Sequence, residues 1–388
     1  MGFADFLYDL HFTAGLPRTF GTYLFGVVSV LYGLALVSGV LLYAPVFFKD
    51  LFALRIGANL KRLWQDAHNV VGMLSLPFHV IFAWSGAVLC LGVLLLAPFQ
   101  FLVFDGKLLQ ILEPDFELTP HVAPANRAAP VLPIATLLEK ARAASPGFVP
   151  ESVSYHDAGD ANARVEVYGH HDQRQLNTLG GVALEGATGK VLCVLSPRTM
   201  RAGTAALRGL QGLHFGNFGH APLQWLYFLL GLGGAFLFYS GNLLWIETRR
   251  KRRQLAQPRR THAMARLTVG VCLGSVAGIS ALFTAARVLP PGQERVVYYA
   301  VFAACVLWAA LRPTARGAYE VLLACAALTA AIPLASCFSA TGPVLPWRDT
   351  LVLTVDVVAL VMAWSYWQLA RASKRRGAQG DPNSVWAW

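Results

Sequence analysis

Charged residues are scarce in this chain. Lys, Arg, Asp and Glu make up 14% of its 388 residues, whereas 55% are hydrophobic, and the mean hydropathy is +0.49. A soluble globular protein carries about 25% charged residues, so this chain lacks the charge to cover a surface that faces water. The shortage argues against a soluble enzyme and predicts a protein embedded in a lipid bilayer.

Cysteines with a recognisable spacing are also missing. Of the six cysteines, only Cys193 lies clearly inside the long segment 98–210, which therefore has no partner for an internal disulfide. No Cys-x-x-Cys-His sequence occurs, which excludes a c-type haem attached to that motif. Any haem in this protein would be held without a covalent bond to the chain.

Long apolar runs are abundant instead. Stretches long enough to cross about 30 Å of hydrocarbon lie near residues 22–44, 66–97, 221–246, 263–288, 296–312, 319–338 and 350–370. The fifth is the shortest. We predict a mainly α-helical, polytopic membrane bundle of about seven spans.

Basic residues in the short segments predict the orientation, because they collect on the cytoplasmic side. One set of segments holds Lys49, Arg55, Lys61, Arg62, Arg249, Arg250, Lys251, Arg252, Arg253, Arg259, Arg260, Arg312, Arg316, Arg371, Lys374, Arg375 and Arg376. The opposite set holds only Arg18, Arg287, Arg295 and Arg348. The bias predicts a multi-pass protein of a bacterial inner membrane, with a periplasmic N-terminus and a cytoplasmic C-terminus. It also accounts for most of the net charge of +11, so we expect no nucleic-acid partner.

We expect four parts along the chain. Residues 1–97 form a periplasmic N-terminal segment and two membrane helices, and 98–210 a periplasmic domain. Residues 211–262 form the third membrane helix and a basic cytoplasmic loop, and 263–388 four membrane helices and a cytoplasmic tail. Within 98–210 we predict a small α+β unit, in which a helix packs on an antiparallel sheet. Its helix is predicted at Ile134–Ala144 and its strands at Glu151–Tyr155, Arg164–Tyr168, Gly181–Leu184 and Lys190–Val194.

Two histidines of the predicted second span carry the main chemical signal. His68 and His79 are eleven residues apart, which in one continuous helix is about 16.5 Å and within about 20° of three full turns. Both imidazoles would then leave one face. They cannot ligate the same haem iron from opposite sides, so the spacing suits two haems, each with a second ligand from another helix.

Few residues offer that second ligand. His262 opens the fourth span, His11 precedes the first, and His214 and His220 precede the third. Our first choice is His68 with His262 for an inner haem and His79 with His214 for an outer haem. His11 is the main rival of His214, and the glycine-rich stretch around His214 must bend inward for that pairing.

Other polar groups have weaker signals. Arg55, Arg62, Arg201 and Arg208 are candidate partners for haem propionates, although the topology explains many basic residues equally well. Asp356 lies inside the last predicted span, where it would contact a buried hydroxyl or a proton path. We expect no residue to act as a catalytic acid, base or nucleophile. The competing interpretation of the membrane histidines is that they only pack against neighbouring helices.

Several motifs resemble the PepSY-associated transmembrane helix family. They are Asp9-Leu10-His11, Val37-Ser38-Gly39-Val40, Phe47-Phe48-Lys49-Asp50-Leu51-Phe52, Asp66-Ala67-His68-Asn69, Leu76-Pro77-Phe78-His79, Trp84-Ser85-Gly86 and Leu213-His214-Phe215-Gly216. The similarity covers most of residues 5–260, and the segment 98–210 is similar to the family's PepSY domain.

Within that family, the chain resembles the FoxB-type ferrisiderophore reductases. The resemblance implies an oxidoreductase that carries b-type haem, for which the histidine spacing suggests two sites in series, and that reduces siderophore-bound ferric iron at the periplasmic side for iron uptake. A quinol or a cytoplasmic reductant would donate the electrons. The alternatives are a non-enzymatic, membrane-anchored PepSY module and a permease for iron chelates.

Overall fold

The computed structural model describes most of the chain. The described residues are 2–47, 54–55, 60–108, 110–112, 118–120, 122–249, 257–338, 349–380 and 384–388. Lys49, Arg250–Arg253 and Arg348, which entered the predicted orientation, lie outside them, as does most of the Phe47–Phe52 motif. The chain divides into two compact units. The first unit comprises Met1–Gly21, Val46–Met73 and Ala235–Trp388, and the second unit comprises Thr22–Pro45 and Leu74–Gly234.

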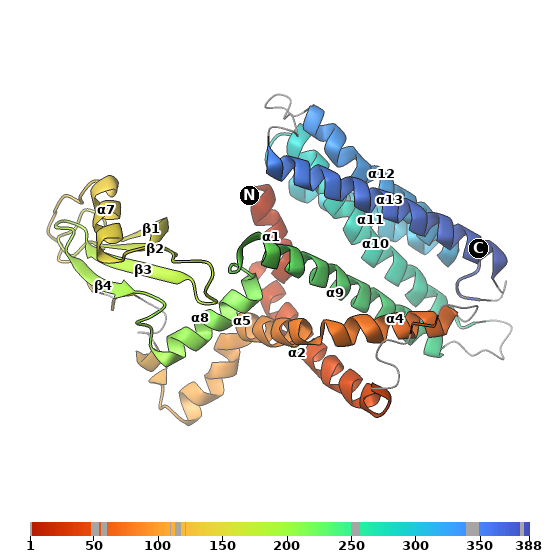
Figure 1. Ribbon diagram of the computed structural model, residues 1–388, viewed down its shortest axis with the longest axis horizontal. Helices are drawn as coiled ribbons and strands as arrows, with labels where there is room; N and C mark the ends of the chain where they lie inside the picture. The colour runs from red at the N-terminus through yellow and green to blue at the C-terminus, as the bar shows by residue number, and fades with distance from the viewer. Residues whose placement is uncertain are drawn as a thin grey trace. The chain divides into compact units, whose positions relative to one another are not determined.

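The predicted spans are present as helices. Among the described residues, 7 helices are long and apolar enough to cross a membrane, which makes this a multi-pass membrane protein. They are α2 (Arg18–Tyr43, extended by the 3-10 turn Ala44–Val46), α5 (Leu76–Leu102), α9 (His220–Arg249), α10 (Arg259–Val288), α11 (Glu294–Leu311), α12 (Thr314–Cys337) and α13 (Thr350–Gln379) (Figure 1).

The predicted second span is not one continuous helix. It consists of α4 (Leu60–Leu74) and α5, with Ser75 between them. Pro77 lies in the first turn of α5, where its missing N–H does no harm, whereas it would break the hydrogen-bond ladder of a continuous helix. His68 therefore belongs to α4 in the first unit and His79 to α5 in the second. The expectation of a single straight helix across both histidines is wrong, and their spacing no longer fixes a shared face.

Small residues bring the membrane helices of the first unit close together. Helices α10 to α13 run alongside one another (Figure 1). Gly270, Gly274 and Gly278 form a stripe on α10 that faces α11. A Cβ on Gly270 would lie 2.9 Å from Val306 Cα, and one on Gly278 would lie 2.9 Å from Tyr298 Cδ2. Glycine is thus needed for this close approach of two helices, as is usual in membranes.

Two pairs of buried polar side chains hydrogen-bond to each other in this bundle. Ser280 and Thr329 are 2.8 Å apart, and Ser336 donates to Asp356 Oδ1 at 3.0 Å. The second contact is the buried hydroxyl expected for Asp356. Outside the bundle, the short helix α1 (Phe3–Thr13) docks by placing Phe6 edge-on to Tyr298 at 5.6 Å.

The second unit contains the predicted α+β element. Helix α7 (Ile134–Ala144) packs on a four-stranded antiparallel sheet in the order β1-β2-β3-β4. The strands are β1 (Val149–His156), β2 (Arg164–His170), β3 (Leu179–Glu185) and β4 (Val191–Leu195). Alternate strand residues face the helix. Val165 and Val167 of β2 and Val182 and Leu184 of β3 form a buried core with Leu137 and Ala141 of α7 and with Phe148. The predicted helix and strands are confirmed. Helix α8 (Ala202–Phe215) follows the sheet.

Candidate functional site

His68 is held by a serine of α9. Its Nδ1 lies 2.8 Å from the Oγ of Ser240, which is completely buried. The Ser240 hydroxyl also lies 3.3 Å from the carbonyl of Leu237 in its own helix. Ser240 therefore contacts Nδ1 of the ring and leaves Nε2 on the other side of it. Histidine ligands of metals commonly bind through one ring nitrogen while the other is held by a hydrogen bond of this kind.

The surroundings of His68 are closely packed. A Cβ on Gly241 would lie 3.5 Å from His68 Cε1, so the glycine lets the ring approach the backbone of α9. Trp64, one turn earlier on α4, stacks on Phe236 with ring centroids 5.8 Å apart. These contacts fix α4 against the C-terminal half of α9 within the first unit.

A second anchor of α4 is an arginine clamp on a buried carboxylate. Arg55 donates from Nε to Asp66 Oδ2 at 2.8 Å and from Nη2 to Oδ1 at 2.6 Å. Asp66 is only 4% exposed. Hydrogen bonds from the Arg55 side chain lower the pKa of Asp66, because they favour its charged form. Arg55, a candidate propionate partner, thus binds Asp66, two residues before His68.

His79 is the most deeply buried of the candidate ligands. It is 2% exposed, and its Nε2 is buried without a hydrogen-bond partner. A Cβ on Gly234 would lie 3.2 Å from its Cε1, and the ring of Tyr32 meets it edge-on at 6.0 Å. A buried polar nitrogen without a partner is costly, so the Nε2 of His79 requires an explanation such as a bound metal.

His214 repeats the arrangement seen at His68. It lies in the last turn of α8, and its Nδ1 is 2.7 Å from Ser85 Oγ. Ser85 donates to the carbonyl of Ile81 at 2.6 Å. Ser85 thus contacts Nδ1 of His214 as Ser240 contacts Nδ1 of His68. Phe82 covers the ring at a centroid distance of 5.0 Å.

The glycine-rich stretch after His214 turns the chain, as the sequence requires. Helix α8 ends at Gly216, which has φ 60°, and Gly219 has φ 71° before α9 begins at His220. Tyr227 donates to the carbonyl of Leu213 at 2.6 Å and so ties α9 back to the end of α8. The turn lets His214 reach Ser85 on α5. Ser85 lies six residues, about 9 Å, along α5 from His79, so a shared iron for these two histidines stays a prediction.

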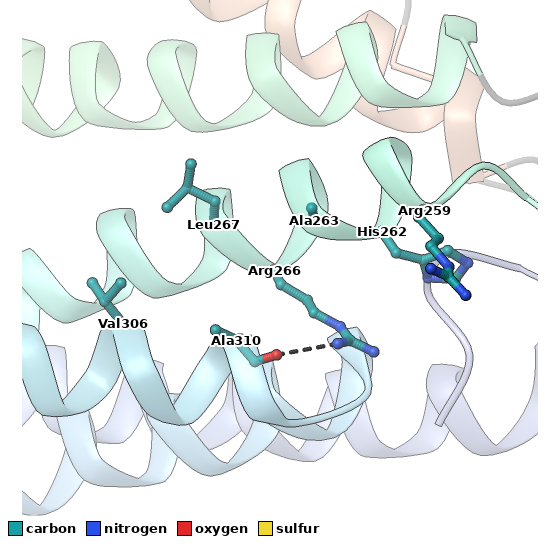
Figure 2. Close-up of a pocket in the computed structure, with 7 residues that line it drawn as sticks. All are labelled: Arg259, His262, Ala263, Arg266, Leu267, Val306 and Ala310. Atoms are coloured by element: carbon teal, nitrogen blue, oxygen red, sulfur yellow. Dashed lines mark hydrogen bonds between the residues drawn. The ribbon is translucent and has the colours of Figure 1, made fainter.

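The remaining predicted residues lie in different surroundings. His262 is in the first turn of α10 and lines a pocket with Arg259 and Arg266 (Figure 2), so its pairing with His68 also stays a prediction. His11 is exposed near the end of α1, and His220 is exposed at the start of α9.

The candidate arginines other than Arg55 lie on or beside α4 and α8. Arg62 lies on α4 and Arg201 precedes the first turn of α8. Arg208 in the middle of α8 donates from Nη1 to Gln211 at 2.9 Å, and its Nε is buried without a hydrogen-bond partner. Arg208 therefore retains a donor for an anionic group, which suits a propionate.

Sequence reasoning assigned no role to the two serines, although Trp84-Ser85-Gly86 is among the motifs of the family resemblance. Each belongs to an aromatic–Ser–Gly triplet, Trp84-Ser85-Gly86 and Tyr239-Ser240-Gly241, inside an apolar helix. The repetition of this triplet on two helices is the signal that could have found them. The role of the triplet follows only from the structure, in which each serine lies beside a histidine.

The residue types present fit haem. Haem iron takes only axial ligands from the protein, and imidazole is one of them. The buried Nε2 of His79 has no hydrogen-bond partner, and the rings of His79 and His68 lie beside Gly234 and Gly241. Among the described residues, no group of three or more His, Cys, Asp and Glu side chains could hold a metal ion.

Comparison with known proteins identifies the family. The family model for the PepSY-associated TM region matches residues 1–248. This chain belongs to the PepSY-associated TM family. A relative, Uncharacterized protein PA4219 of Pseudomonas aeruginosa, is 30% identical over 352 residues, covering 84% of this chain and 86% of its own length. The PepSY-associated TM region includes His11, His68, His79 and His214 and both serines, whereas His262 and α10–α13 follow it.

Proposed function

We propose that this protein holds b-type haem on its membrane histidines and moves electrons across the bacterial inner membrane. The observation that carries the proposal is the hydrogen bonding of His68 and His214. In both, a buried serine that also contacts a backbone carbonyl of its own helix lies within hydrogen-bond distance of Nδ1. We infer that each ring donates from Nδ1 and coordinates iron through Nε2, because second-shell bonds of this type orient histidine ligands in metalloproteins.

The proposed roles of the residues follow from their surroundings. His79 and His214 hold the outer haem, with His11 as the rival ligand, and His68 and His262 hold the inner haem. Bound haem would supply a one-electron carrier whose potential depends on its ligands and its burial. Gly234 and Gly241 give the histidine rings room beside α9, and Arg208 offers its free Nε to an anionic substituent.

We propose ferric iron in a siderophore as the substrate, as in FoxB-type ferrisiderophore reductases. With the N-terminus and residues 98–210 in the periplasm, a quinol or a cytoplasmic reductant gives up electrons, and each Fe(III) takes up one to become Fe(II). Fe(II) is a softer ion than Fe(III) and binds hard oxygen ligands less tightly, so the chelate releases it for uptake. The basic segments then face the cytoplasm.

The test is an optical spectrum of the purified full chain, expressed with ample iron and porphyrin. We expect a Soret band that shifts on reduction with dithionite. His68→Ala and His79→Ala should each weaken the band while circular dichroism stays unchanged. His171→Ala is the matched control, because His171 also contacts a serine, Ser145, at 3.3 Å, but lies beside the sheet. A colourless protein would overturn the proposal in favour of a non-enzymatic membrane module or a permease.

A further inference from the structure

The first unit contains a pocket of about 650 Å³ between the N-terminal end of α10 and the C-terminal end of α11 (Figure 2). Its lining has two chemical characters. Arg259, His262 and Arg266 are the basic part, and Leu267, Val306 and Ala310 form an apolar wall. Leu267 is 57% exposed, so the wall is open to whatever surrounds the helices, which for membrane spans is lipid.

The basic part has no anionic partner in the described chain. Among the described residues, neither Arg259 nor Arg266 forms an ion pair. By contrast, Arg312 and Arg316, which follow Ala310 in the sequence, both bind Glu320, at 3.2 Å and 3.0 Å. Arg266 donates from Nη1 to the Ala310 carbonyl at 3.1 Å, and its Nε is buried without a hydrogen-bond partner. The Arg266 guanidinium is thus held at the pocket, and its Nε–H is left to donate to a bound group.

The start of α10 adds to this electrostatic imbalance. Its first turn contains no acidic residue, and Pro258 at the N-cap has no side-chain acceptor for the N–H groups of that turn. The N-terminus of a helix carries partial positive charge, so cations there are unfavourable and anions are favourable. Arg259 and His262 therefore occupy a position that a bound anion would stabilise.

We propose that this pocket binds an anionic phospholipid. The phosphodiester headgroup would contact Arg259, Arg266 and the first turn of α10, and an acyl chain would lie along Leu267 and Val306. Free phosphate would leave the apolar wall without a role, and a zwitterionic lipid would not neutralise the cations. Basic pockets between membrane helices bind anionic headgroups in this manner. His262 also lines this pocket and is the proposed second ligand of the inner haem, so the lipid contacts are assigned to the two arginines and the apolar wall, none of which is a proposed iron ligand.

The experiment uses the full chain in neutral detergent with added phosphatidylglycerol, phosphatidylcholine or inorganic phosphate. Native mass spectrometry counts the lipids retained, and the thermal unfolding midpoint reports binding independently. We expect phosphatidylglycerol to bind and to raise the midpoint. Arg259→Gln and Arg266→Gln should each weaken its binding about fivefold. Leu267→Trp, which fills the apolar part without changing charge, should weaken it too.

Arg260→Gln is the matched control. Arg260 lies in the same helical turn and carries the same charge, but it does not line the pocket, so its variant should bind phosphatidylglycerol as the wild type does. Equal losses in Arg259→Gln and Arg260→Gln would overturn the proposal, because they indicate a diffuse basic surface. Equal binding of phosphatidylcholine, or equal stabilisation by inorganic phosphate, would also overturn it. If Arg266→Gln does not fold, the binding of phosphatidylglycerol to Arg259→Gln and to Leu267→Trp tests the proposal instead.

Discussion

His68 in the first unit and His214 in the second are bound by serines in the same way, but the two serines are not equally constrained. Ser85 donates to Ile81 at 2.6 Å and lies 2.7 Å from His214, whereas Ser240 donates to Leu237 at 3.3 Å and lies 2.8 Å from His68. The shorter pair of bonds should hold the imidazole of His214 more firmly.

The units also differ in what accompanies each serine-bound histidine. In the second unit His79 is buried with a bare Nε2. In the first unit the second candidate ligand, His262, lines a pocket with two arginines. The second unit thus contains more of a complete ligand set. What makes a histidine a good candidate ligand is therefore its neighbours: a hydrogen-bond partner on Nδ1, an Nε2 without a partner and space beside the ring.

The largest expected effect comes from removing the candidate ligands. If each unit holds one haem, His79→Ala and His68→Ala should each remove about half of the haem per chain, and the double variant nearly all of it. Haem content by the pyridine haemochrome assay measures this. A single variant that loses all haem would show that the two sites are not independent, and unchanged content in His68→Ala would leave only the second unit with haem.

Next in size are the serines. Ser85→Ala leaves the Nδ1 proton of His214 buried without an acceptor, which costs about 1–3 kcal/mol, and makes the ring a poorer donor to Fe(III). We expect the midpoint potential of the affected haem to rise by roughly 30–60 mV, since about 59 mV corresponds to a tenfold change for a one-electron couple. Redox titration of the optical spectrum measures the shift.

The same redox titration tests the serine of the first unit against that of the second. Ser240→Ala should shift the potential in the same direction but less, because its hydrogen bonds are longer. Ser365→Ala is the control, since Ser365 donates to its own helix at 2.8 Å and contacts no histidine. A shift of similar size in Ser365→Ala would mean that the effect comes from the helix and not from the imidazole.

Acid should affect the first unit through the Arg55–Asp66 clamp. The folded pKa of Asp66 is lowered by its bonds to Arg55, so the clamp stabilises the fold fully above the ordinary aspartate pKa of about 3.9. That contribution is lost as the pH falls below this value toward the folded pKa. We expect the absorption spectrum of the haem held by His68 to change in this pH range, and an optical titration with acid measures the change. Asp66→Asn should show the change already at neutral pH and should not respond further to acid.

The smallest effects are expected at the two glycines of α9. A Cβ at Gly241 would meet His68 Cε1 at 3.5 Å, which is ordinary contact, whereas at Gly234 it would meet His79 Cε1 at 3.2 Å. Gly241→Ala should leave the spectrum unchanged and stabilise α9 by up to about 1 kcal/mol. Gly234→Ala should displace His79 slightly and broaden its haem spectrum. Identical spectra for both variants would show that the closer approach has no consequence.

Much of the fold was predictable because its signals are local. The apolar runs mark the seven spans, and the alternation in Arg164–Tyr168 marks a strand of the sheet that the structure confirms. The break at Ser75 was missed even though Pro77 is visible in the sequence. A proline in the first turn of one helix looks the same as a proline that kinks a longer helix, because the choice depends on packing.

Only the histidines of the candidate site could be predicted from the sequence, and the serines could not. Histidine is rare in membrane helices, so His68, His79 and His214 stood out as ionisable groups in apolar surroundings. Serine is common there, and nothing local distinguishes Ser240 from Ser365. Only the contact with a ring 172 positions away in the sequence separates a ligand-orienting serine from one that merely bonds to its own helix.

The amino-acid sequence alone determined the membrane class, the number of spans, the α+β element and the identity of the candidate ligands, because hydropathy, periodicity and residue type act over short stretches. Tertiary structure decided that Nδ1 of His68 and of His214 meets a serine, that Arg55 binds Asp66, and that Arg266 binds the Ala310 carbonyl of α11. Those outcomes depend on which groups meet across helices. A hydrogen bond or an ion pair forms over about 3 Å of space, whatever the distance along the chain.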